Sequence, residues 1–223
     1  MKPTYYSNIY WHFTGSPSGI DWGKIRRPKD ILKHGKPKDI EDSIAILKKI
    51  LKNKTLKATA TEEIFSEHLT EEFCCVTDIP LNSLVNHKKF YGNVAIGFNC
   101  NKIHKFFNPV LYLPQKFLLK SAGSIKITTP ENEFVEMPAY TLDREKINRY
   151  FFNHIKITMF SEKADDSFYQ EREWRKIGDF KFEEKDIEAI IAPKECTQEI
   201  IKFLKDYKFY NPSIISWDLI DKG

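Results

Sequence analysis

The segment that most narrows the possible folds lies near the C-terminal end, where two short apolar runs flank an amphipathic stretch. Residues 188–192 read EAIIA and residues 214–217 read IISW, so both are predicted to be strands. A helix is predicted between them, capped by Thr197 and running to about Tyr207. This order of strand, helix and strand predicts a local βαβ-like unit.

A second constraint is the amphipathic stretch over residues 39–53, for which a helix is predicted. Its apolar residues recur at helical spacing and form one stripe, which consists of Ile40, Ile44, Leu47 and Leu51. Lysines gather in its last turns, where the helix dipole favours cations; these are Lys48, Lys49 and Lys52. A solvated helix end explains the lysines, and phosphate binding is the alternative.

The remaining chain mixes short apolar strands with segregated helices. Strands are predicted over residues 5–14, 73–77, 94–98, 110–113, 154–159 and 172–177, with a further candidate over 125–128. Helices are predicted over residues 25–35, 81–89 and 145–152, and residues 163–169 are expected to form a charged connection. This pattern favours an α+β fold over a doubly wound sheet. With 223 residues and no internal repeat, a single domain over residues 1–223 is expected.

Composition excludes several classes of protein. Hydrophobic residues make up 41% of the chain, which is too much for a disordered protein. The net charge of +4 permits a nucleic-acid partner without requiring one. The four cysteines form no CxxC pair and are expected to be free thiols in a reducing cytosol. Because no apolar run resembles a signal peptide or a membrane span, a cytoplasmic protein without a membrane partner is expected.

Standard phosphate, dinucleotide and metal motifs are absent from the sequence. There is no P-loop, no GxGxxG motif and no HExxH motif, and the six histidines are scattered, so no metal is expected. Glu173 and Lys176 have ExxK spacing rather than the ExK spacing of many nuclease cores, which weakens a nuclease interpretation.

The main candidate for chemistry is the EREWR segment, which contains Glu171 and Glu173. Two residues apart on a strand, these carboxylates are expected to project from one face. One carboxylate can stabilise a sugar carbon that becomes positive while the other orients or deprotonates a nucleophile. Like charges this close also raise the pKa of one of them. The alternative is an exposed charged strand whose glutamates pair with arginines across the sheet.

Two further candidates lie near the predicted strands. His12 and Thr14 share one face of the opening strand, where they are suited to hold the hydroxyls of a ribose. The alternative for His12 is a hydrogen-bonded core histidine. Tyr91 precedes Gly92, and an exposed tyrosine beside a glycine can stack on a flat ring. Its alternative is a turn with a packing aromatic side chain.

Several of these motifs resemble known families. His12-Phe13-Thr14, residues 31–35 (ILKHG) and residues 107–112 (FNPVLY) resemble the corresponding stretches of DarT-type DNA ADP-ribosyltransferases. A closer resemblance is to the AbiGi-like abortive-infection proteins of bacteria. It runs through residues 73–81 (FCCVTDIPL), His87, residues 91–98 (YGNVAIGF), residues 108–110 and residues 171–175 (EREWR).

The resemblance to ADP-ribosyltransferases implies a split mixed sheet with peripheral helices around an NAD cleft, with NAD as a substrate. It implies that Glu173 is the catalytic carboxylate and that Glu171 orients the acceptor. It also implies NAD-binding roles for His12, Thr14, Tyr91 and Arg175. The protein would then be an NAD-dependent ADP-ribosyltransferase or an NAD glycohydrolase, with a nucleic acid among the candidate acceptors.

The resemblance to AbiGi proteins implies a role in bacterial defence against phage, with a cognate defence or toxin–antitoxin partner. It supports a first alternative, a non-catalytic antitoxin or a sensor of a phage signal that binds a partner on the same scaffold. The modest basic excess leaves a nucleic-acid-binding defence protein as a second alternative.

Overall fold

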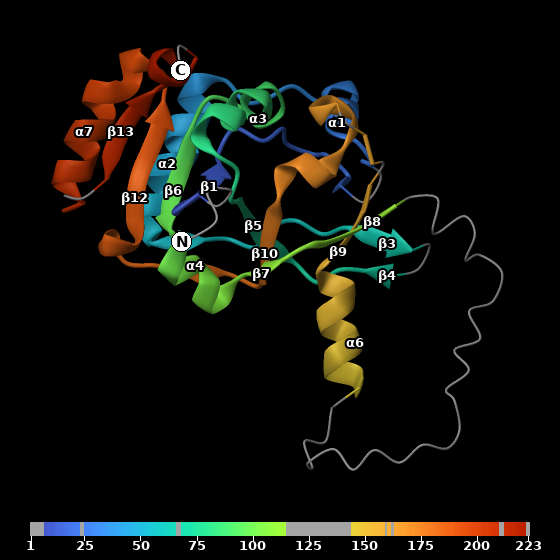
Figure 1. The fold of residues 1–223 in the computed structure, drawn as a ribbon. Coiled ribbons are helices and arrows are strands. Elements are labelled where there is room, and N and C mark those ends of the chain that lie inside the picture. The colour runs from blue at the N-terminus through green and yellow to red at the C-terminus, as the bar shows by residue number, and fades with distance from the viewer. Residues whose placement is uncertain are drawn as a thin grey trace, which may run out of the picture.

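The main sheet has strands drawn from the whole length of the chain. The computed structural model describes residues 7–22, 25–65, 68–114, 144–158, 160–161, 163–209 and 212–221. Within these ranges, seven strands pair in the order β13-β12-β6-β1-β5-β10-β7. In Figure 1 they run from β13 on the left to β10 near the centre. Their bounds are β1 Ile9–Phe13, β5 Phe73–Thr77, β6 Ala95–Asn99, β7 Asn108–Pro109, β10 Glu173–Ile177, β12 Ile187–Ala192 and β13 Ser213–Ser216.

The sheet is mixed, because β12 and β13 pair in parallel while the other pairings are antiparallel. The parallel pair is joined by α7 (Thr197–Asp206), as the predicted βαβ-like unit requires. Three smaller pairs flank the sheet: β2 (Thr55–Leu56) with β11 (Phe180–Lys181), β3 (Glu63–Phe65) with β4 (His68–Leu69), and β8 (Leu111–Pro114) in parallel with β9 (Ile155–Thr158). The expected α+β class is confirmed.

Helices cover both faces of the sheet. On one face, α2 (Ile40–Asn53), α4 (Cys100–Phe106) and α7 pack their apolar residues against β6 and β12. On the other face, α3 (Leu84–Tyr91) and α8 (Trp217–Ile220) pack on β1 and β6. Two further helices, α1 (Pro28–His34) and α6 (Arg144–Asn153), lie towards the end of the molecule that carries β8 and β9 (Figure 1).

The amphipathic stripe predicted for residues 39–53 forms the buried face of α2. Asp39 caps the helix by accepting a hydrogen bond from the amide of Asp42 at 2.8 Å. The buried side chains of the helix include Ile44, Leu47 and Leu51. The helix ends where Lys54 adopts a left-handed conformation, a common helix terminator.

Several predicted elements differ from the observed ones. Thr197 is the first residue of α7 and not its cap, since Cys196 occupies the capping position without a side-chain bond. The connection over residues 163–169 contains the 3-10 turn Ala164–Asp166 and leads into a second 3-10 turn, Phe168–Glu171. A helix that was not predicted, α4, follows β6, because the side chain of Asn99 caps the amide of Asn101. The candidate strand over residues 125–128 lies outside the described residues.

No helix in the described ranges is long and apolar enough to cross a membrane.

Two glycines bring the end of β1 against the end of α3. Gly92 terminates α3 with φ 88° and ψ −176°, a region open essentially to glycine alone. A Cβ atom at Gly92 would lie 2.8 Å from the Cα of Gly15, and one at Gly15 would lie 2.8 Å from the carbonyl oxygen of Tyr91. This close backbone contact fixes Tyr91 beside the strand that carries His12.

Replacing Gly92 by alanine is therefore expected to destabilise the fold through backbone strain and through a steric clash. Gly178→Ala is the matched control, since Gly178 also has a positive φ of 73° but open space around its Cα. We expect Gly178→Ala to cost about 1–2 kcal/mol and Gly92→Ala to cost clearly more. Urea denaturation of the three proteins measures the difference. Equal losses would contradict a structural role for the contact between Gly15 and Gly92.

Candidate active site

A cavity of about 280 Å³ opens beside the C-terminal part of β1 and the adjoining strand β5. This volume is close to the lower limit of about 300 Å³ for pockets that bind small molecules. Its lining combines apolar and charged side chains and includes His12, Thr14, Trp22, Lys38, Glu62, Tyr91, Lys156, Glu171 and Glu173. The cavity thus brings together five of the six residues that the sequence analysis singled out.

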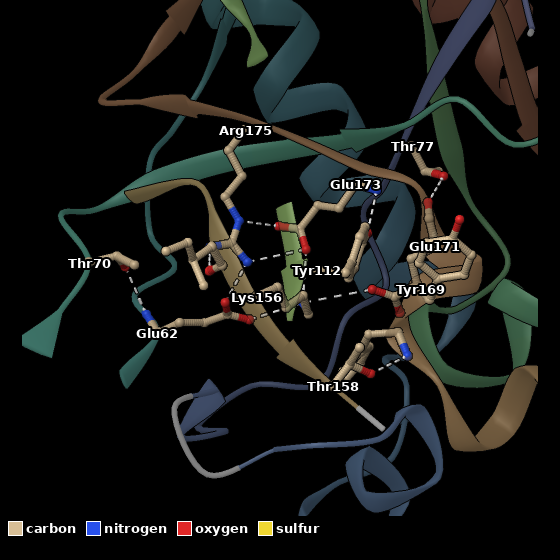
Figure 2. A network of polar contacts seen from close by, with 12 residues as sticks. Glu62, Thr70, Thr77, Tyr112, Lys156, Thr158, Tyr169, Glu171, Glu173 and Arg175 are labelled. Carbon is tan, nitrogen blue, oxygen red and sulfur yellow. Dashed lines mark hydrogen bonds and ion pairs between the residues drawn. The ribbon is translucent and has the colours of Figure 1, made fainter. Parts of the chain in front are cut away.

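Five charged side chains form a buried group at the cavity, which we call the carboxylate cluster: Glu62, Lys156, Glu171, Glu173 and Arg175 (Figure 2). The ammonium group of Lys156 lies 2.8 Å from Glu173, 3.0 Å from Glu62 and 3.8 Å from Glu171. The cluster joins β9 and β10 to the segment that precedes β3.

Arg175 is the member of the cluster that does not line the cavity. Its guanidinium donates from Nε to Glu173 Oε1 at 2.6 Å and also pairs with Glu62. Its remaining contacts are to the carbonyl oxygens of Asn153 and Ile155, and its guanidinium lies 4.2 Å from the ring centre of Phe73. Arg175 has no exposed surface and does not line the cavity. The structure therefore places it as an internal support of Glu173, away from the surface on which NAD was expected to bind.

The two glutamates of the EREWR segment come together by a different geometry from the one predicted. Glu171 ends the 3-10 turn Phe168–Glu171, and Arg172 is left-handed with φ 47° before β10 begins at Glu173. Arg172 is held in this position by two bonds to the carboxylate of Asp78, at 2.6 and 3.0 Å. The prediction that Glu171 and Glu173 share one strand face is thus wrong, although both side chains line the cavity.

Glu173 is held as a carboxylate. Burial favours its neutral form, but Arg175 and Lys156 outweigh this effect and lower the pKa of Glu173 to about 2. Its two oxygens bond to these two cations, and its backbone amide donates to the hydroxyl of Tyr112 at 2.7 Å. Glu173 is therefore an oriented anion in the wall of the cavity.

Glu171 has a different environment. Burial raises the pKa of Glu171 to about 7; Glu173 adds to this increase, while Lys156 and the hydroxyl of Tyr91 oppose it. The Tyr91 hydroxyl donates a hydrogen bond to Glu171 Oε1, and the hydroxyl of Thr77 donates to the Glu171 carbonyl oxygen. Glu171 can therefore gain and lose a proton near neutral pH.

The cluster has three carboxylates and two cations, so it carries one uncompensated negative charge when Glu171 is ionised. When Glu171 is protonated, the cluster is formally neutral. Buried charges without partners are costly. A positively charged group of a ligand is therefore favoured beside Glu171, while the lining of the same cavity also includes Lys38 and Lys57.

His12 and Thr14 lie on the cavity wall as the sequence suggested. His12 donates from Nδ1 to the carbonyl oxygen of Cys75 at 2.9 Å, and burial lowers its pKa. The neutral ring therefore keeps Nε2 as an acceptor. The hydroxyl of Thr14 donates to the Ser43 carbonyl oxygen at 2.9 Å, so it can contact a ligand only by accepting a hydrogen bond.

Tyr91 ends α3 and packs among aromatic rings. Its ring is nearly parallel to that of Trp22, with centroids 6.3 Å apart and planes inclined by 21°. It also lies near the rings of Phe13, His87 and Phe90. The hydroxyl that binds Glu171 makes Tyr91 a positioning residue for this carboxylate, in addition to the stacking role proposed from the sequence.

Sequence reasoning missed Glu62 and Lys156. Lys156 lies in the predicted strand over residues 154–159. Because apolar and polar residues alternate there, the pattern predicts that the Lys156 side chain faces solvent. In the structure this face is buried, since His154, Lys156 and Thr158 are all buried. Glu62 has no surrounding motif that would have singled it out. Among the described residues, no group of His, Cys, Asp or Glu side chains is arranged to hold a metal ion.

The raised pKa of Glu171 gives a testable dependence of stability on pH. Its folded pKa of about 7 exceeds the unfolded value of about 4.3, so between these values the folded state binds more protons. The contribution of Glu171 to stability is therefore present below about pH 4 and lost as pH rises through 7. Relative to wild type, Glu171→Gln is expected to gain on the order of 3 kcal/mol between pH 4 and pH 8.

Urea denaturation gives the free energy of unfolding of both proteins at each pH. The gain appears as a change with pH in the difference between the two free energies. A difference that stays constant with pH would show that the carboxyl group of Glu171 titrates normally.

Comparison with known proteins gives a family for the chain. Among curated proteins, none matches it. Two solved structures resemble it along most of its length, both of DarT from Thermus sp. 2.9. The complex with NAD+ has 13% sequence identity and a TM-score of 0.42, and the alignment covers 94% of each chain. The complex with carba-NAD+ has 14% identity and a TM-score of 0.41, with 93% of this chain and 95% of that chain covered.

A family model described as "Putative abortive phage resistance protein AbiGi, antitoxin" matches residues 45–215. The match includes β5, α3, β6 and the EREWR segment, so it contains most of the strands and charged residues that build the cavity. Because it spans well over half of the sequence, the chain belongs to the AbiGi family of abortive phage resistance proteins.

Proposed function

We propose that this AbiGi-family protein acts in defence against phage by binding NAD and cleaving the bond between nicotinamide and ribose. The observation that carries the proposal is the uncompensated carboxylate of Glu171 at the cavity, next to the fixed anion of Glu173. NAD is cationic at its nicotinamide ring, and cleavage moves this positive charge onto the ribose. A preorganised anionic wall stabilises both the bound ring and the transition state.

The distribution of charge around the cavity also suits NAD. The carboxylates are buried, whereas two lysines of the lining are more accessible: Lys38 is half-buried and Lys57 is exposed. A ligand with a cationic end and an anionic pyrophosphate matches this arrangement. We infer that the nicotinamide ribose enters the cavity and that the pyrophosphate lies towards the lysines.

The residues then take distinct roles in the proposed reaction. Glu173, fixed by Arg175 and Lys156, is the catalytic carboxylate that accepts a hydrogen bond from a ribose hydroxyl and stabilises the positive sugar. The neutral Nε2 of His12 accepts a hydrogen bond from a second ribose hydroxyl, and the hydroxyl oxygen of Thr14 is a further hydrogen-bond acceptor. Glu171 takes the proton of the nucleophile, since its pKa of about 7 suits a general base.

Loss of NAD on incubation with purified protein tests this function. Wild type is expected to release nicotinamide, and Glu173→Gln or Glu171→Gln is expected to reduce the rate at least a hundredfold. Glu72→Gln is the control, since Glu72 is exposed and lies outside the cavity lining. If Glu173→Gln does not fold, Glu171→Gln alone decides the outcome. No loss of NAD by the folded wild type would refute the proposal.

The rate should also depend on pH. The base must be ionised to act, so kcat/KM for NAD is expected to rise with pH through an apparent pKa near 7. This rise should be absent from the residual activity of Glu171→Gln. A profile that falls with pH over the same range would exclude Glu171 as the base.

A second candidate function is favoured by the word antitoxin in the family description. In that case the protein binds a partner without catalysis. Large exposed apolar side chains are available for such an interface, among them Leu69, Leu111, Phe151, Phe160 and Tyr169.

Expression in bacteria separates the two functions. An NAD-consuming effector slows growth of its host, and Glu171→Gln should relieve this effect while the protein accumulates to the same level. A non-catalytic antitoxin is harmless when expressed alone, and the same substitution changes nothing.

A further inference from the structure

A second, smaller cavity lies on the other side of the Glu171 side chain. Its volume is about 90 Å³, and three residues line both this cavity and the larger one: His87, Tyr91 and Glu171. These three side chains therefore form a shared wall. A nucleophile in the small cavity would therefore lie next to Glu171, which also faces the large cavity.

His87 lines both cavities and contributes a polar group without a partner to the wall that they share. The side chain is more than nine-tenths buried, and its Nε2 atom has no hydrogen-bond partner among the described residues. The imidazole packs against the rings of Phe13 and Tyr91, with centroids 5.9 and 5.7 Å away. Burial lowers the pKa of His87 to about 4, so the ring is neutral. A buried ring nitrogen without a hydrogen-bond partner is destabilising, so this polar group favours a polar neighbour.

The size of the cavity limits what a molecule bound there can be. About 10–15 Å³ of such space is enough for one water molecule, so a cavity of about 90 Å³ has room for several waters. A nucleotide, or a protein side chain together with the backbone that carries it, is larger than this space. The polar part of the lining, which includes Ser83, Asn86 and Gln170 besides His87 and Glu171, suits hydrogen-bonded water. The side chains of Ser83 and Asn86 are exposed, so this part of the lining connects the cavity to solvent.

We propose that water, delivered through this small cavity, is the acceptor of ADP-ribose, and that the protein is an NAD glycohydrolase. This inference rests on the proposed function of the larger cavity. The water oxygen forms a bond to the ribose carbon as the bond from that carbon to the nicotinamide nitrogen breaks. The electron pair of the broken bond stays on that nitrogen and makes nicotinamide neutral. One proton of the water passes to Glu171 and then to solvent.

The charge of the cluster fits this sequence of events. Bound NAD places its positive ring near Glu171 and favours the ionised carboxylate, which is the form that accepts a proton. Once nicotinamide leaves as a neutral molecule, the cluster is neutral only if Glu171 is protonated. Bound NAD therefore favours the ionised form of Glu171, and cleavage then favours transfer of the water proton to this carboxylate.

The products distinguish water from other acceptors. Purified protein is incubated with NAD, and also with added single-stranded DNA and a bacterial lysate. Hydrolysis gives free ADP-ribose and nicotinamide in equal amounts whether or not these additions are present. ADP-ribose attached to DNA or protein, at the expense of free ADP-ribose, would overturn the inference but leave the proposed function intact. The absence of nicotinamide release would overturn both.

Blocking the small cavity tests the path of the water. Asn86→Trp places a large side chain at its exposed rim, and Asn82→Trp makes the same change at an exposed position outside its lining. We expect Asn86→Trp to slow hydrolysis at least tenfold while the Kd for NAD changes less than twofold. Asn82→Trp should match wild type in both measurements. Equal hydrolysis rates in the two variants would show that water does not reach Glu171 through this cavity.

Discussion

The site depends on the buried ion pairs of Lys156 and Arg175 with Glu62 and Glu173. Each of these charges costs several kcal/mol to remove from water, so the four side chains are stable only together. Their pairing fixes β9, β10 and the segment before β3 in one arrangement and holds Glu173 at the cavity. The same arrangement leaves Glu171 as the fifth charged member, with Lys156 3.8 Å away as a shared rather than a dedicated cation. The geometry of the ion pairs thus leaves Glu171 as a carboxyl group whose charge can vary near neutral pH.

The sequence predicted the elements whose formation is local. The stripe of α2 and the apolar strands β5, β6 and β12 were identified because periodicity and short buried runs reveal burial directly. The EREWR segment was identified by its two carboxylates, but the strand geometry assumed for it was wrong. Arg172 is left-handed there and bonds to Asp78, a contact between distant segments that no local pattern indicated. Glu62 and Lys156 were missed because their roles come from pairing between distant segments, which no local pattern records.

A cluster that served stability alone would not need this composition. Replacing buried ion pairs by apolar residues of similar volume is often neutral or stabilising. Here three carboxylates surround two cations, and one carboxylate has a raised pKa beside a cavity. Ionised Glu171 therefore lowers the stability of the folded protein above neutral pH. Such a cost is expected where a charged group binds a ligand. An antitoxin that acted only through its surface would not need this arrangement, and this is the argument for the proposed catalytic function over the antitoxin alternative.

Tyr91 connects the backbone to this chemistry. The contact between Gly15 and Gly92 fixes the end of α3 against β1, so the Tyr91 hydroxyl is held where it donates to Glu171. A donor at this position favours the ionised carboxylate and opposes the effect of burial, which keeps the pKa near neutrality instead of higher. The same side chain separates the two cavities together with His87. Under the proposed hydrolysis, Glu171 would face the cationic substrate in the larger cavity and water in the smaller one, so substrate and nucleophile would approach the base from different cavities.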